Sequence, residues 1–137
     1  MRLRATLFPI ILLVCSYGKA QVKDDFSDGD FTSEYVWSGN TTDFEVDGSN
    51  KLHLSAPAET AESFLAVSNS FIDEASWEFV IEMDFNPSSS NQLFVYLVSD
   101  QQDLTASLNG YLVRIGNTDD EISLYRQDGI STSKIID

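Results

Sequence analysis

The sequence predicts an all-β fold, an antiparallel β-sandwich, and three observations indicate it. Residues 77–85 alternate apolar side chains with mostly acidic ones, which is the period of a strand with one buried face. Residues 93–98 are apolar on both faces, so we expect them inside a sheet that is covered on both sides. Short segments of this kind recur with turn residues between them and without helical segments, which favours two antiparallel sheets over a parallel α/β sheet.

The first 20 residues have the pattern of a secretory signal peptide. Arg2 and Arg4 precede an apolar run over residues 7–14, and small residues allow cleavage after Ala20. The run is shorter than the roughly 20 residues that cross a bilayer, and no later segment approaches that length. We therefore expect a signal peptide, 1–20, followed by one secreted module, 21–137, with no membrane span.

Cys15 raises the possibility of a lipid anchor, but the residue before it, Val14, is not small, which favours release. Cleavage after Ala20 removes this cysteine, so the mature chain has no thiol and no disulfide. Its five basic and 22 acidic residues give a net charge of −17. Such a surface repels nucleic acid and anionic lipid and favours association with cations.

The front part of the module contains one clear hairpin signal. Residues 44–46 and 51–54 are short strand patterns on either side of a Gly-containing turn. Residues 21–30 form a polar opening, and residues 63–67 predict a further strand. Residues 71–75 are too short for a stable helix and predict a loop or single turn between the two sheets.

The rear part reads as a series of strands joined by turns. Alternation within 93–98 places Phe94, Tyr96 and Val98 on one face, and residues 101–109 predict a loop with at most one helical turn. Three more strands are expected: residues 110–115, with Tyr111, Val113 and Ile115 on one face; residues 121–126, with Ile122 and Leu124 inward; and residues 132–136, after an Asp128-Gly129 hairpin turn. The sequence stops directly behind that last strand, so we expect the sandwich to be incomplete at its C-terminus.

Three strings carry a resemblance to a known family: DDFSDGDFTSEYVWSGNTTDFEV, WEFVIEMDFNPSSSNQLFVYLVSDQQDLTASLNGYLVRIG and EISLYRQDG. Together they resemble the N-terminal concanavalin A-like (LamG-like jelly-roll) module of large secreted bacterial proteins. In those proteins the module often precedes lamin-tail domains, immunoglobulin-like repeats and a type IX secretion sorting domain. The resemblance implies a jelly roll, an extracellular or cell-surface location and further domains downstream; it transfers no catalytic residue. The family module continues past residue 137, which also implies missing final strands.

A catalytic alternative rests on Glu82 and Asp84. Glu82-Met83-Asp84-Phe85-Asn86 resembles the first part of the E-x-D-x-E strand of jelly-roll glucanases. Retaining glycosidases need two carboxyl groups about 5 to 5.5 Å apart, which two positions on one strand face can approach. However, Asn86 occupies the third acidic position, so we interpret the acids as a solvated strand face.

Two other groups are candidate binding residues. Asp24, Asp25, Asp28 and Asp30, with Gly29 between them, could supply oxygen ligands to a structural calcium ion, although the spacing is not that of an EF-hand. Asn117, Asp119, Asp120 and Glu121 form a second acidic loop that we interpret as a turn. Trp37, Trp77, Tyr96 and Tyr111 could stack on a sugar ring, and Trp37 is the best candidate because it lies beside a loop. His53, the only histidine, predicts a solvent-facing strand residue.

Three functions are therefore compatible with the sequence. The first is a non-catalytic secreted module for adhesion or carbohydrate recognition, whose partner is an extracellular glycan or cell-surface component. The second is a glycoside hydrolase, intact or degenerate, that uses Glu82 and Asp84. The third is a structural spacer without a ligand. A shared fold does not separate the three, because function resides in particular sites.

Overall fold

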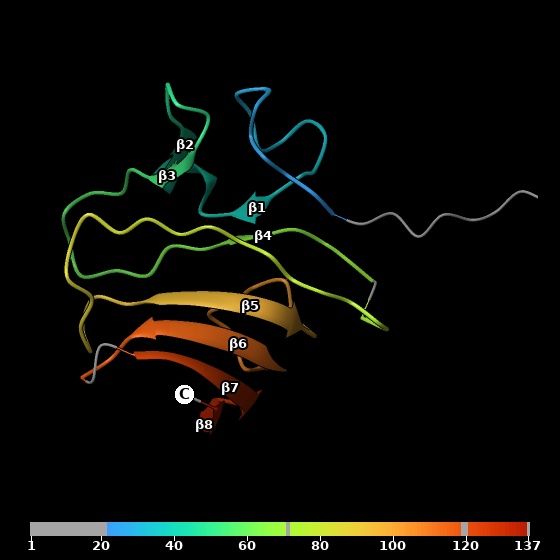
Figure 1. Ribbon diagram of the computed structural model, residues 1–137, viewed down its shortest axis with the longest axis vertical. Coiled ribbons are helices and arrows are strands. Elements are labelled where there is room, and N and C mark those ends of the chain that lie inside the picture. Colours follow the sequence, from blue (N-terminus) through green and yellow to red (C-terminus); the bar gives the residue numbers. More distant parts are fainter. Residues whose placement is uncertain (1–21, 71, 119–120, 137) are drawn as a thin grey trace, which may run out of the picture.

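The computed structural model describes residues 22–70, 72–118 and 121–136 and is almost entirely β-structure and loop (Figure 1). The expected signal peptide, residues 1–20, lies outside this description. The elements are β1 (Ser38–Gly39), the 3-10 helix η1 (Thr41–Asp43), β2 (Phe44–Val46), β3 (Leu52–Leu54), β4 (Leu65–Ala66), β5 (Leu93–Ser99), β6 (Leu108–Gly116), β7 (Glu121–Gly129) and β8 (Ser131–Ile136). All their pairings are antiparallel, which confirms the all-β, antiparallel prediction.

The largest unit is a four-stranded sheet in the order β5-β6-β7-β8 (Figure 1). Its strands match the expected segments 93–98, 110–115, 121–126 and 132–136, and each of the four is longer than predicted. The hairpin turn lies one residue later than expected: Asp128 pairs with Ser131, so Gly129 and Ile130 form the turn. Gly129 has φ +64°, a conformation that glycine adopts without a steric penalty.

The front part contains two small sheets. The β2–β3 hairpin is confirmed, and its register pairs Phe44 with Leu54 and Val46 with Leu52. His53 is exposed on β3, as expected. The predicted strand over residues 63–67 is reduced to the two residues of β4, which pair with β1, a strand that the sequence did not predict.

The prediction of a strand over residues 77–85 is wrong, because this segment forms neither strand nor bridge. Its side chains are largely exposed: Val80 is 97%, Phe85 52% and Trp77 46% exposed. A strand needs a neighbour that accepts and donates its backbone hydrogen bonds, and none of the described residues forms a ladder with this segment. For the same reason β5 lies at the edge of its sheet and not inside it.

The sheet has one well-buried face, here called the hollow face. It carries the buried apolar side chains found among the described residues, Leu108, Leu112 and Tyr125, together with buried Ser123 and Gln127. A register shift between Tyr96 and Val98 turns Val98 to the opposite face, so the expectation that Phe94, Tyr96 and Val98 share one face fails at Val98.

The opposite face is apolar but open. Ile122, expected inward, is 67% exposed, and Tyr111 is 44% exposed, whereas Leu124 is half-buried. Ile122 lies opposite Ile115 in the ladder, so the apolar residues of the two strands do share a face. The expectation that Ile122 points inward is wrong, because apolar alternation alone does not show which face of the sheet another layer covers.

Candidate functional site

A hollow of about 360 Å³ lies on the hollow face of the sheet. Strands β5, β6 and β7 form its floor, and a loop before β6 and the start of β8 contribute to its rim. Its lining residues are Glu62, Phe94, Tyr96, Leu104, Thr105, Ala106, Leu112, Arg114, Tyr125, Gln127, Ile130 and Thr132. The mixture of aromatic rings and polar groups on a concave surface is typical of a small-molecule binding site.

The strand register assembles the floor. Phe94 of β5 pairs with Arg114 of β6, and Tyr96 pairs with Leu112, which in turn pairs with Tyr125 of β7. Directly opposed residues on neighbouring strands project from the same face, so three rings from two strands border one hollow. Phe94 is 43% exposed and offers a ring surface to a ligand, whereas Tyr125 is 8% exposed and belongs to the core.

Hydrogen bonds fix the polar groups beside Tyr96. Its hydroxyl donates to Gln127 Oε1 at 2.6 Å, and Gln127 Nε2 donates to the Gly129 carbonyl oxygen at 2.9 Å. Burial raises the pKa of the Tyr96 hydroxyl, and the nearby Glu62 carboxylate raises it further. Tyr96 therefore stays a neutral hydrogen-bonding group at physiological pH.

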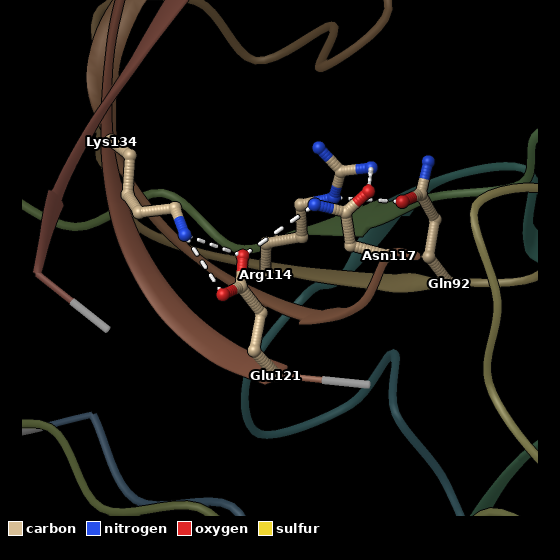
Figure 2. Close-up of polar contacts among 5 residues, drawn as sticks. All are labelled: Gln92, Arg114, Asn117, Glu121 and Lys134. Carbon is tan, nitrogen blue, oxygen red and sulfur yellow. Dashed lines mark hydrogen bonds and ion pairs between the residues drawn. The ribbon is translucent and has the colours of Figure 1, made fainter. Parts of the chain in front are cut away.

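Arg114 lies at the centre of a polar network (Figure 2). Its Nε donates to Gln92 Oε1 at 2.7 Å, and its Nη2 lies 3.3 Å from Asn117 Oδ1. The guanidinium carbon lies 5.7 Å from the ring centroids of both Phe94 and Tyr125, within the range of cation–π attraction. The side chain is thus fixed by two amides and two rings.

The network continues to the sheet edge through Glu121. Asn117 Nδ2 lies 3.5 Å from Glu121 Oε1, and Lys134 of β8 pairs with the Glu121 carboxylate at 2.8 Å (Figure 2). Lys134 holds the pKa of Glu121 below its ordinary value. Asn117 itself has φ +97°, a strained conformation for a residue with a side chain, which the turn between β6 and β7 imposes.

The expected catalytic pair lies elsewhere. Glu82 and Asp84 belong to the segment without strand pairing, and neither lines the hollow. The Glu82 carboxylate forms an ion pair with Lys51 next to β3, in which both side chains are mostly exposed. The structure therefore provides no strand that would set the two carboxyl groups at a fixed separation.

The acidic opening uses its carboxylates to shape its own loop. Asp24, Asp25, Asp28 and Asp30 each accept a hydrogen bond from a backbone N–H one or two residues further along the chain. Hydrogen bonds from Ser27 and Thr32 lower the pKa values of Asp25 and Asp30, respectively. Within the described residues, no three acidic, histidine or cysteine side chains converge to hold a metal. The calcium site stays a prediction.

Trp37 is bound into the same opening. Its Nε1 donates to Asp24 Oδ2 at 2.8 Å, and its ring lies 6.2 Å from the ring of Phe26. The half-buried indole is therefore already engaged in packing this loop, and its role as a sugar platform stays a prediction. Of the second acidic loop, Asn117 and Glu121 belong to the network around Arg114, and Asp119 and Asp120 lie outside the described residues.

Sequence reasoning identified Tyr96 as an aromatic candidate but missed four residues of the hollow: Phe94, Arg114, Tyr125 and Gln127. Arg114 carries a local signal, because it stands between two apolar residues of β6 and so occupies the opposite face of that strand. Gln127 stands between two charged residues, Arg126 and Asp128, and carries no such signal. Only the pairing of β5 with β6 and of β6 with β7 shows that these positions meet on one face.

Comparison of the chain with protein-family models, with curated proteins and with solved structures finds no match. In the part of the chain that the structure describes, no helix has the length and apolar character needed to cross a membrane.

Proposed function

We propose that this protein is a secreted, non-catalytic module that recognises carbohydrate through the hollow on its β5–β8 sheet. In this proposal it is a concanavalin A-like jelly-roll module within a larger extracellular or cell-surface protein. The observation that carries the proposal is the half-exposed ring of Phe94 beside polar groups that other contacts already orient. Export is supported by the signal-peptide pattern of residues 1–20.

The chemistry of the hollow suits a sugar ring. A pyranose presents an apolar face of C–H groups, which packs against an aromatic ring, and a rim of hydroxyls that both donate and accept hydrogen bonds. Phe94 supplies the ring, and Thr105, Gln127 and Thr132 supply neutral groups of both kinds. Because Gln127 is already oriented by Tyr96 and Gly129, binding costs less side-chain entropy.

A hydrolase is the weaker alternative. Both glycosidase mechanisms need two carboxyl groups that flank the scissile bond, at about 5 to 9.5 Å from one another. Glu62 is the one carboxylate among the described residues that line the hollow. The hollow therefore has the aromatic and polar groups that bind a sugar but lacks, among the described residues, the second carboxylate that cleavage requires.

The test is a glycan array probed with the mature chain and with two matched variants. Phe94→Ala removes a ring from the hollow, and Phe79→Ala removes an equally exposed ring from the segment without strand pairing; both rings are 43% exposed. We expect binding that weakens about tenfold or more in Phe94→Ala, equivalent to about 1.4 kcal/mol, and that is unchanged in Phe79→Ala.

The other outcomes separate the alternatives. Equal loss in both variants would contradict a site in the hollow. Failure of the folded protein to bind any glycan would contradict recognition and favour the spacer. Release of shortened saccharides, abolished in both Glu82→Gln and Asp84→Asn, would establish the hydrolase instead.

A further inference from the structure

Arg114 differs in its contacts from three of the other basic residues. Lys51, Arg126 and Lys134 each form an ion pair with a carboxylate. Arg114 instead donates hydrogen bonds to two neutral amide oxygens, of Gln92 and Asn117, and within residues 22–70, 72–118 and 121–136 no carboxylate forms an ion pair with it. In a mature chain with 22 acidic and five basic residues, this is an unusual choice of partners.

The guanidinium also keeps hydrogen-bonding capacity. An arginine has five N–H donors, and the two amides account for one on Nε and one on Nη2. In Figure 2 the other terminal nitrogen points away from Gln92, Asn117 and Glu121. Arg114 lines the hollow, so a charged donor group that is already held in place is available to a bound molecule there.

We propose that the hollow selects saccharides that carry an anionic group, a carboxylate or a sulfate ester, and that Arg114 binds this group. The inference rests on the proposed carbohydrate recognition and names the chemical class of its ligand. The planar guanidinium matches the geometry of carboxylate and sulfate oxygens, and such charge-assisted hydrogen bonds are about twice as strong as neutral ones. The rings of Phe94 and Tyr125 hold the guanidinium in its orientation before a ligand binds.

Two features of the protein oppose an anion, and both are testable. Glu62 lines the same hollow and repels a negative ligand, so Glu62→Gln should strengthen binding of an acidic saccharide. The strongly negative surface repels it over longer distances, and at about 0.15 M salt this repulsion is screened beyond about 8 Å. Contact with Arg114 lies well inside that distance and so persists at physiological salt.

The experiment measures affinities at about 0.15 M salt for four probes: trigalacturonic acid, its methyl ester, a sulfated galactose trisaccharide and its unsulfated form. The ester and the unsulfated sugar remove the charge without altering the protein. We expect at least tenfold tighter binding of one charged probe than of its uncharged counterpart, and the charged pair distinguishes a carboxylate from a sulfate.

The matched protein variants are Arg114→Gln and Arg126→Gln. Each removes one positive charge, but Arg126 pairs with Tyr111 in the ladder and so lies on the opposite face of the sheet. We expect Arg114→Gln to abolish the preference for charged probes and Arg126→Gln to preserve it. If Arg114→Gln does not fold, Arg114→Lys is the substitute variant. It retains the charge but lacks the planar pair of N–H donors of a guanidinium, so it should reduce the preference for charged probes only in part.

Three results would overturn the inference. Equal affinity for charged and uncharged probes, or a preference for the uncharged ones, would leave carbohydrate recognition standing and contradict an anionic ligand. An anionic preference that persists in Arg114→Gln would place the anion elsewhere. Binding of none of the four probes, together with a glycan array on which no saccharide binds, would remove both this inference and the proposed function.

Discussion

The part of the chain before β5, here called the front part, and the β5–β8 sheet have similar apolar patterns. They differ in whether the patterned segments pair as strands and bury their apolar side chains. Residues 77–85 show the clearest strand alternation in the sequence and form no ladder, whereas β6, with two glycines and an arginine, is the centre of the sheet. Leu112 of β6 is 2% exposed, and Leu54 of β3 is 54% exposed. Periodicity shows which side chains can share a face, but burial depends on a partner strand and a covering layer.

The largest expected effect compares those two leucines. Leu112→Ala should lower the free energy of unfolding by about 3 kcal/mol, because a fully buried leucine loses its packing and leaves a cavity. Leu54→Ala removes the same atoms from an exposed site and should cost less than about 1 kcal/mol. Urea unfolding of both variants measures the difference; equal losses would contradict a core confined to the sheet.

Two glycines provide a comparison of intermediate size. A Cβ on Gly110 of β6 would lie 2.3 Å from the carbonyl oxygen of Val98, whereas a Cβ on Gly48, in the β2–β3 turn, meets no atom within 4 Å. Gly110→Ala should therefore destabilise the protein by about 2 kcal/mol. Gly48→Ala should leave the stability unchanged or raise it by up to about 1 kcal/mol. A neutral Gly110→Ala would show that β5 and β6 do not approach as closely as described.

The smallest effects come from two ion pairs. The Glu121 side chain, paired with Lys134 in the sheet, is 15% exposed, and Glu82, paired with Lys51 in the front part, is 67% exposed. Lys134 lowers the pKa of Glu121 below its ordinary value of 4.5, so this stabilisation is present above pH 4.5 and is lost as the pH falls through the folded-state pKa. Glu121→Gln should therefore lower the urea midpoint more at pH 7 than at pH 3.

Glu82→Gln is the control for that measurement. Exposed ion pairs contribute little to stability, so we expect almost the same midpoint as the parent protein at both pH values. A larger effect of Glu82→Gln than of Glu121→Gln at pH 7 would show that the exposed pair with Lys51 contributes more to stability than the pair in the sheet.

The sequence predicted the rear strands well because each carries local information of its own. Gly116 ends β6, Gly129 lies in the turn between β7 and β8, and the β2–β3 hairpin was likewise found from its turn residues. The strand over 77–85 was predicted wrongly because its pattern contains no information about a partner. The inward orientation of Ile122 was predicted wrongly because apolar side chains do not identify the layer that covers them.

The candidate site shows the same limit. Tyr96 was found from its residue type, but the sequence pattern did not single out Arg114 or Gln127, and Gln127 stands between two charged residues, Arg126 and Asp128. Their meeting depends on register across three strands, which includes the irregularity between Tyr96 and Val98. Such non-local pairing cannot be read from a single strand.

Amide hydrogen exchange followed residue by residue tests most directly whether the β5–β8 sheet is the ordered scaffold of the hollow. We expect the slowest exchange in β6 and β7, whose backbone groups pair on both sides, and fast exchange throughout residues 77–85. Slow exchange at residues 77–85, as strong as that of β6, would contradict that expectation. That result would mean that this segment is a paired strand and that a second sheet shares in supporting the fold.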